Sequence, residues 1–235
     1  MKSKTLLSFL CCAFGLATCL QAAPAYMKDD PYANLPRFNF TAKKGKWDVA
    51  KNWQEGKVPN AGWSRAQIKG GCTLTVSCPV DNSESINLGA LSSDKCEMYI
   101  ENGAKMKLSL LFVPFAGHTG SNAVAHMRGG ELSVGNDKDG GGVLSVGTGG
   151  TFSGTGVFEL SGGKFKGGIK VGSSIANTQH GTLIVKGSQA SVSTNTAGNN
   201  FLMLEASGTL EFQLDEKGVT LMNYRGGRVH FYPGC

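Results

Sequence analysis

The stretch from Ala123 to Ser193 repeats one pattern three times: AHMRGGELSVG at 125–135, FELSGGKFKGG at 158–168 and LIVKGSQASVS at 183–193. Each copy has a short alternating apolar run, a Gly-Gly or Gly-Ser break and a second alternating run. The copies align without gaps at offsets of 33 and then 25 residues. One such unit cannot bury its apolar face alone, so neighbouring units must stack. The pattern predicts an all-β chain in which each coil of a β-solenoid lies on the coil before it.

Glycine is the most informative part of the composition. Gly makes up 34 of the 235 residues, and 16 of the 44 residues from Gly129 to Gly172. No Pro occurs between Pro114 and Pro233, as expected for strands that have hydrogen-bonded neighbours on both edges. Regularly placed Leu, Val, Phe and Ile argue against a flexible linker or a collagen. The glycines expected at the turns of the coils are Gly71, Gly103, Gly129, Gly130, Gly162, Gly163 and Gly187.

Alternation within the repeats predicts which side chains point inward. The inward set is Met106, Leu108, Leu132, Val134 and Phe165, and the alignment places Ala190 in the same column as Leu132 and Phe165. The outward set pairs Lys105 with Lys107, Glu131 with Ser133, Lys164 with Lys166 and Gln189 with Ser191. The four lysines of this outward set could bind an acidic polysaccharide. The alternative is an ordinary solvated strand face.

The repeat extends towards the N-terminus. QIKGGCTLTVS (67–77) aligns without gaps on YIENGAKMKLS (99–109), which matches Gly71 with Gly103 and Leu74 with Met106. The coils are therefore expected over residues 66–235, with an atypical last coil from about 208. An antiparallel jelly roll or sandwich is the competing fold, and strand direction distinguishes the two.

The segment GKWDVAKNWQEGKVPNAGWSRAQI (45–68) contains all three tryptophans, within a span of 17 residues. Large rings at this place would close the first coil and bury its apolar surface. We expect residues 26–65 to form a lead-in and a cap built from Trp47, Asn52, Trp53, Pro59 and Trp63. A tryptophan platform for sugars is the alternative.

The N-terminus has the pattern of an export signal. Lys2 and Lys4 precede the apolar run Leu6–Leu20, and Ala23-Pro24-Ala25 fits a cleavage site. Residues 1–25 are therefore predicted to be a signal peptide, with no membrane span after cleavage. Removing two lysines and no acidic residue lowers the net charge from +6 to +4. So modest an excess argues against a nucleic-acid partner.

Four cysteines remain after cleavage: Cys72, Cys78, Cys96 and Cys235. Cys72 and Cys78 would lie about 20 Å apart on one strand, which is too far for a disulfide. Cys96 could pair with either of them, or all could be free thiols. Without a Cys-x-x-Cys pair, a zinc site is not expected.

Several motifs resemble the bacterial autotransporter-associated β-strand repeat and related exported β-helix proteins. GVFELSGGKFKGGIKVG (156–172) and GTLIVKG (181–187) look like its coils, and GKWDVAKNW (45–53) looks like its initial W-x4-N-W motif. GTLEFQLDEKGVT (208–220) is similar to the segment that often follows the repeats. The resemblance implies a right-handed single-stranded parallel β-helix at the cell surface, with no catalytic residues to carry over. We expect a short or truncated member, because no outer-membrane barrel or sorting tail follows.

Residues that could carry chemistry are scattered. Asp137 and Asp139 fit a turn better than a calcium loop. The other acidic candidates (Glu131, Glu159, Glu205 and Asp215) and the histidines (His118, His126, His180 and His230) show no catalytic or metal spacing. No cofactor or metal is expected.

These features predict a secreted, non-enzymatic, structural or adhesin-like β-helix of the cell surface or extracellular space. Its partners would be surface glycans, or further copies of the chain joined through an exposed last coil. The alternative is a carbohydrate-active β-helix, either a polysaccharide lyase or a glycan-binding module. Several carboxylates beside an Arg or Lys in an outward groove would favour the enzyme, and a plain Lys/Ser/Thr face would favour the scaffold.

Overall fold

The computed structural model describes residues 35–59, 64–115, 118–135, 142–148, 153–174, 178–187, 189–193, 202–213 and 229–231. The chain divides into two units, Met1–Asn34 and Leu35–Cys235. The first unit, and with it the predicted signal peptide, lies outside the described residues. Trp63, Asp137, Asp139, Asp215 and Cys235 also lie outside them.

The described chain is all-β apart from one short 3-10 helix. Its strands are β1 (Arg37–Phe40), β2 (Lys44–Lys46), β3 (Arg65–Ile68), β4 (Thr73–Val76), β5 (Pro79–Leu88), β6 (Lys95–Ile100), β7 (Lys105–Val113), β8 (Ser121–Val134), β9 (Val143–Val146), β10 (Gly154–Val171), β11 (Gln179–Lys186), β12 (Ala190–Ser193), β13 (Leu202–Leu204), β14 (Gly208–Gln213) and β15 (Val229–Phe231). The 3-10 helix η1 spans Ala50–Asn52.

The strands form three ladders, and every pairing between described strands is parallel. Ladder one contains β2, β4, β6, the first part of β8, the first part of β10, β11 and β14. Ladder two joins the start of β5, the start of β7, the end of β8, the middle of β10 and β12. Ladder three contains β1, β3, the ends of β5 and β7, β9, the end of β10, β13 and β15.

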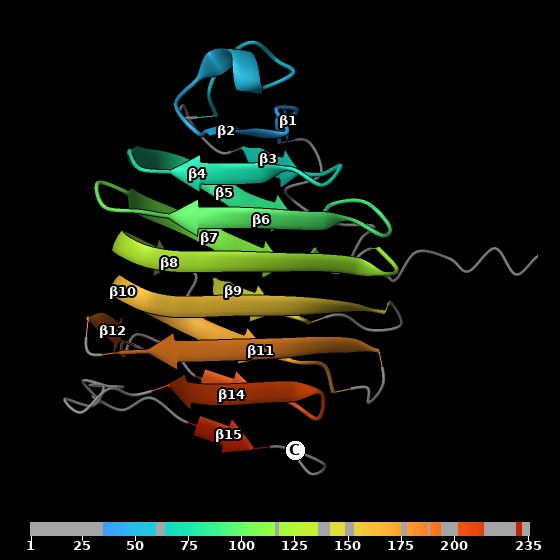
Figure 1. Ribbon diagram of the computed structural model, residues 1–235, viewed down its shortest axis with the longest axis vertical. Helices are drawn as coiled ribbons and strands as arrows, with labels where there is room; N and C mark the ends of the chain where they lie inside the picture. The colour runs from blue at the N-terminus through green and yellow to red at the C-terminus, as the bar shows by residue number, and fades with distance from the viewer. Residues whose placement is uncertain are drawn as a thin grey trace, which may run out of the picture. The chain divides into compact units, whose positions relative to one another are not determined.

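From β4 onward the chain passes through ladders one, two and three in turn, and we call one such passage a circuit. Figure 1 shows ladder one nearest the viewer, with successive strands stacked from β2 to β14. Parallel pairing excludes the jelly roll and the sandwich, because those sheets are antiparallel. An isolated antiparallel bridge joins Phe40 to Trp53, outside the ladders.

Equivalent residues of successive circuits stack inside the ladders. The inner column of ladder one consists of Leu74, Met98, Ala125, Phe158, Leu183 and Leu210. The predicted inward residues Met106, Leu108, Leu132, Val134 and Phe165 are all at most 3% exposed. Alternation therefore identified the core correctly, and burial of these columns stabilises the stack because one circuit leaves its apolar edges open to water.

The gapless alignment of the repeats is confirmed in part. Phe158 pairs with Ala125 and with Leu183, as the alignment predicts. In ladder two, however, Phe165 pairs with Val192 and not with Ala190. The chain between β11 and β12 is longer than its counterpart in β10, so the register shifts by two residues there.

The predicted match between 67–77 and 99–109 is wrong. Leu74 stacks on Met98, whereas Met106 lies in ladder two and pairs with Val80 and Leu132. Gly71 precedes β4 and Gly103 follows β6, so the two glycines occupy different corners of the circuit. The same Gly-containing motif occurs at both corners, which misled the alignment.

Positive φ angles mark many of the turns. Among the glycines singled out from the sequence, those with positive φ are Gly71, Gly103, Gly130, Gly163 and Gly187. Gly162 has an ordinary φ, but a Cβ there would lie 2.5 Å from the carbonyl oxygen of Arg128. At Gly129, a Cβ would meet first the exposed side chain of Asn102, which can move aside. These corners depend on glycine for conformation or for close approach of neighbouring circuits.

A compact segment after β2 packs over the first strands (Figure 1). Trp47 and Trp53 are 0% and 2% exposed, and their ring centroids lie 4.9 Å apart. The Trp53 Nε1–H donates to the Trp47 carbonyl oxygen at 2.8 Å. Asn52 donates to the Lys46 carbonyl oxygen at 2.9 Å, and Pro59 is buried. These rings cannot stack on a sugar, so the platform alternative is wrong for Trp47 and Trp53.

Cys72, Cys78 and Cys96 are free thiols. Cys72 and Cys96 are buried and occupy adjacent positions of ladder one, since Thr73 pairs with Glu97. Burial raises the pKa of all three thiols. They behave as apolar side chains of the core, and the disulfides considered for Cys96 are not formed.

Candidate functional site

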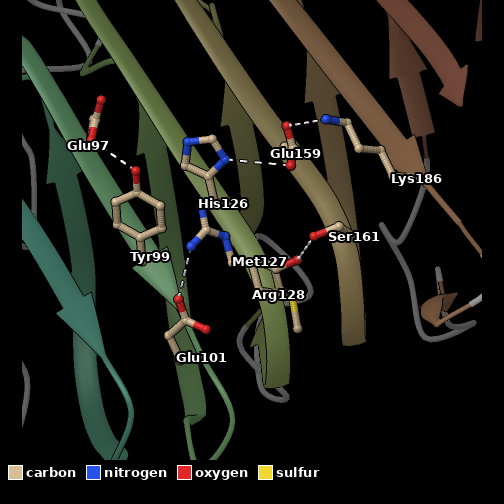
Figure 2. Close-up of polar contacts among 9 residues, drawn as sticks. All are labelled: Glu97, Tyr99, Glu101, His126, Met127, Arg128, Glu159, Ser161 and Lys186. Carbon is tan, nitrogen blue, oxygen red and sulfur yellow. Dashed lines mark hydrogen bonds and ion pairs between the residues drawn. The ribbon is translucent and has the colours of Figure 1, made fainter.

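A group of polar side chains, which we call the polar cluster, lies on the outer surface of ladder one. It consists of Glu97, Tyr99 and Glu101 from β6 and the turn after it, His126 and Arg128 from β8, Glu159 from β10 and Lys186 from β11 (Figure 2). Tyr99 pairs with His126, and His126 with Glu159, so these residues occupy one outward column on successive circuits. Their strand neighbours Met98, Ile100 and Met127 are completely buried. Alternation therefore directs the cluster outward.

Two aromatic rings form the centre of the cluster. The Tyr99 and His126 rings lie 9° from parallel with centroids 4.8 Å apart. Both are half-buried, and the two rings are stacked on each other (Figure 2). The Tyr99 hydroxyl donates to Glu97 Oε2 at 3.1 Å, and the Arg128 Cζ lies 4.3 Å from the Tyr99 ring centroid. Tyr99 is held by contacts on three sides, one of them a cation–π contact.

Ion pairs link the cluster across circuits. The Lys186 Nζ lies 2.8 Å from Glu159 Oε2, and the Arg128 Nη1 lies 3.5 Å from Glu101 Oε1. The His126 Nδ1 lies 3.7 Å from Glu159 Oε1. Each pair joins residues of neighbouring circuits, so the charges connect the circuits on the outer surface as the apolar columns do in the core.

The surroundings shift two pKa values in the cluster. Partial burial raises the pKa of Glu159, but Lys186 and His126 lower it by more, so it lies below its ordinary value. Burial raises the pKa of Tyr99, and its hydrogen bond to Glu97 adds to this, while Arg128 acts against it. At neutral pH, Glu159 is a carboxylate and Tyr99 a neutral phenol.

The four lysines predicted to form an outward ladder lie on ladder two. Lys105 and Lys164 both pair with Glu131, and Lys107 and Lys166 both pair with Ser133. All four lysines are exposed. The Lys164 Nζ lies 3.5 Å from Glu131 Oε1 in a pair whose side chains are 76% and 55% exposed. The last predicted pair is corrected, because Ser191 and Ser193, not Gln189 and Ser191, continue these columns.

In the described ranges, no group of three His, Cys, Asp or Glu side chains could hold a metal ion. None of the helices in those ranges has the length and apolar character needed to cross a bilayer.

The polar cluster was not predicted from the sequence, although all its members except Glu97 stood in the quoted repeats. His126 and Arg128 alternate with buried Met127, which identifies them as outward residues. Tyr99 joins them only at the offset of the β6–β8 pairing. The alignment of 67–77 on 99–109 gave another offset, so the three were never placed together.

A scan against protein-family models, a search of curated proteins and a search of solved structures each found no match. The resemblance to autotransporter-associated repeats therefore depends on the sequence motifs alone.

Proposed function

We propose that this chain is an exported, right-handed parallel β-helix that serves as a structural, adhesin-like surface protein and not as an enzyme. The three parallel ladders support a coiled architecture. Right-handedness is favoured because crossovers between parallel strands of one sheet are right-handed in about 98% of cases.

The observation that carries the proposal is the pairing of outer charges between circuits. Glu159 interacts with Lys186 and His126, and Arg128 interacts with Glu101. A catalytic acid or base needs a pKa tuned towards the operating pH. Here the pKa of Glu159 is lowered, away from a role as general acid, and that of Tyr99 is raised, away from a role as general base. The groups are arranged to hold neighbouring strands together.

Product release tests the non-enzymatic proposal. The purified chain is incubated with polygalacturonate, alginate, hyaluronan and neutral glucans, and unsaturated uronates and reducing ends are measured. We expect no product above a heat-denatured control. Product that disappears in both Glu159→Gln and Tyr99→Phe would overturn the proposal.

A carbohydrate-active β-helix is the second candidate, and the composition of the polar cluster favours it. Glu97, Glu101 and Glu159 lie with Arg128 and Lys186 on one outer surface. These are the carboxylates and cations that a glycan-processing or glycan-binding face would require. The same incubation distinguishes a glycan-cleaving enzyme from a glycan-binding module, since a lyase or glycosidase releases product and a binding module does not.

Export is part of the proposal and is supported by residues 1–25 of the sequence. Expression of the full chain in a bacterial host, followed by mass spectrometry of its N-terminus, tests it. The proposal expects a mature chain that begins at Tyr26 outside the cytoplasm. An intact N-terminus on cytoplasmic protein would contradict export.

A further inference from the structure

We propose that the outer face of ladder two binds an acidic polysaccharide through four lysines, which we call the lysine array: Lys105, Lys107, Lys164 and Lys166. This inference names the ligand class of the proposed adhesin-like function and rests on it. The ligand class follows from three properties of the array: its regular spacing, its exposure and its excess of positive charge.

Strand register places the four lysines at the corners of a rectangle. Lys105 on β7 and Lys164 on β10 both pair with Glu131 on the strand between them, so their Cα atoms lie two strand spacings apart, about 10 Å. The second column repeats this arrangement around Ser133. Along each strand the two lysines are two residues apart, which is about 7 Å. Neighbouring charges of the array therefore lie within about one Debye length at about 0.1 M salt, and their fields add.

The core fixes the strands that carry the array, while the lysine side chains remain open to solvent. Met106, Leu132 and Phe165 alternate with the outward residues on these strands and are at most 3% exposed. All four lysines of the array are exposed. The backbone thus sets the spacing of the charges, and the flexible lysine stems can adjust each ammonium group to a carboxylate of the ligand.

The charge balance of the two columns selects an acidic ligand. Of their described side chains, four are lysines and one, Glu131, is acidic. The Glu131 Oε1 lies 3.5 Å from the Lys164 Nζ in a highly exposed pair. Exposed ion pairs contribute little to stability, so a carboxylate of the ligand can replace Glu131 beside Lys164 at low cost. Ser133 and Ser191 continue the columns and add hydroxyl groups that can bond to a sugar.

The size and composition of the array favour a polysaccharide over a nucleic acid. The array spans three neighbouring strands of ladder two, β7, β8 and β10. A nucleic-acid surface needs a denser basic patch, and the whole chain has a net charge of only +6. Arg is favoured for bidentate contacts to phosphate, but the cations in the described part of the two columns are all Lys. A lysine is a point charge, which suits the separate carboxylates of a uronate chain.

Calorimetric titration of the purified chain with hexagalacturonate, cellohexaose and a DNA hexanucleotide tests the inference. Hexagalacturonate should bind most tightly, and raising the ionic strength from about 0.05 to about 0.5 M should weaken its binding at least about fivefold, because salt screens exposed charges. The double variants Lys105→Gln/Lys107→Gln and Lys164→Gln/Lys166→Gln should each weaken binding about fivefold. Circular dichroism confirms that each variant keeps the fold, and the single variants Lys105→Gln and Lys164→Gln replace a double variant that unfolds.

Glu131→Gln should have the opposite effect on affinity. It removes the acidic side chain that lies between the lysines, so hexagalacturonate should bind about twofold to threefold more tightly. A merely structural role of Glu131 would not produce a gain in affinity.

Lys44→Gln/Lys46→Gln is the matched control. These two lysines are exposed and lie two residues apart on β2, so the variant loses the same charge at the same spacing. Two strands further along ladder one, however, their columns contain Glu97 and Tyr99 and not a second pair of lysines. The control should therefore weaken binding by less than about twofold.

The inference is overturned if hexagalacturonate does not bind, if cellohexaose or the DNA binds as tightly, or if the control loses as much affinity as the variants of the array. Absence of binding together with absence of product would leave the scaffold proposal standing. Cleavage of hexagalacturonate would instead overturn the non-enzymatic proposal, and loss of affinity in the variants of the array would still support the array as the binding surface.

Discussion

At the scale of single residues, the corner within β8, between its parts in ladder one and ladder two, depends on Gly130. Its φ is +72°, and a Cβ there would lie 2.6 Å from the Ala104 carbonyl oxygen on the preceding circuit. We predict that Gly130→Ala lowers the free energy of unfolding by about 2–4 kcal/mol, since left-handed strain of about 1–2 kcal/mol adds to a backbone clash. Urea unfolding followed by circular dichroism measures the change.

Gly56→Ala is the control for this prediction. Gly56 has φ +65°, but a Cβ there would meet nothing within 4 Å. Gly56→Ala should lower the free energy of unfolding only by the backbone strain of the left-handed conformation, about 1–2 kcal/mol. Equal losses in the two variants would mean that close packing between circuits does not restrict Gly130.

Glu159 should make stability depend on pH. Its pKa is lowered in the folded chain, so its ionisation stabilises the fold above the unfolded pKa of about 4.3 and this contribution is lost as pH falls through the folded pKa. We predict that Glu159→Gln lowers the unfolding free energy at pH 7 by about 0.5–1 kcal/mol. Urea titrations from pH 7 to pH 3 should show the difference shrinking below about pH 4.

Glu131→Gln provides the comparison for Glu159. The Glu131–Lys164 pair is highly exposed, with side chains 55% and 76% accessible, so its loss should change stability by close to zero. A difference at Glu159 that does not vary with pH would contradict a role for its ionisation.

At the scale of elements, the segment that covers the first strands is held by Trp53. The ring is buried, it makes T-shaped contacts with Phe40 and Trp47, and its Nε1–H donates to the Trp47 carbonyl oxygen. We predict a loss of about 3–5 kcal/mol for Trp53→Ala. Trp53→Phe, which removes the hydrogen bond from the indole N–H to the Trp47 carbonyl oxygen, should cost about 1–3 kcal/mol. Guanidinium unfolding measures both, and unchanged stability in Trp53→Ala would contradict the capping role.

Strand alternation was predictable from the sequence because it needs only neighbouring residues. Met106, Leu132 and Phe165 were correctly assigned to the core on that basis. Register between circuits was predictable only where the intervening lengths match, as for Ala125 and Phe158. It failed between Phe165 and Val192, because a turn of different length moves the following strand without changing its pattern.

The polar cluster belongs to the part that the sequence does not reveal. Its residues come from four circuits, and their proximity depends on every intervening turn length. The Trp47–Trp53 pair, in contrast, is local in sequence and was predicted to be a cap from its composition. Local patterns therefore identify buried residues, whereas an outer site needs the register.

At the scale of the whole molecule, the outermost described strand of ladder one has an exposed apolar residue. Among the described strands β14 pairs only with β11, and Phe212 is 41% exposed. Open strand edges favour association with further strands. We predict concentration-dependent association that Phe212→Lys weakens, measured by light scattering. Thr182→Lys, on the inner strand β11, is the control, and a monomeric chain at high concentration would contradict the prediction.

The distance between outward positions on successive circuits tests the parallel coil most directly. Thr73, Glu97, Val124, Val157, Thr182 and Thr209 form one outward column. Spin labels attached through an unnatural amino acid at Thr73 and at Val157, Thr182 or Thr209 would be separated by three, four or five strand spacings of about 4.8 Å. The account predicts backbone separations of about 14, 19 and 24 Å by pulsed electron paramagnetic resonance. Distances that do not increase in this order would contradict it.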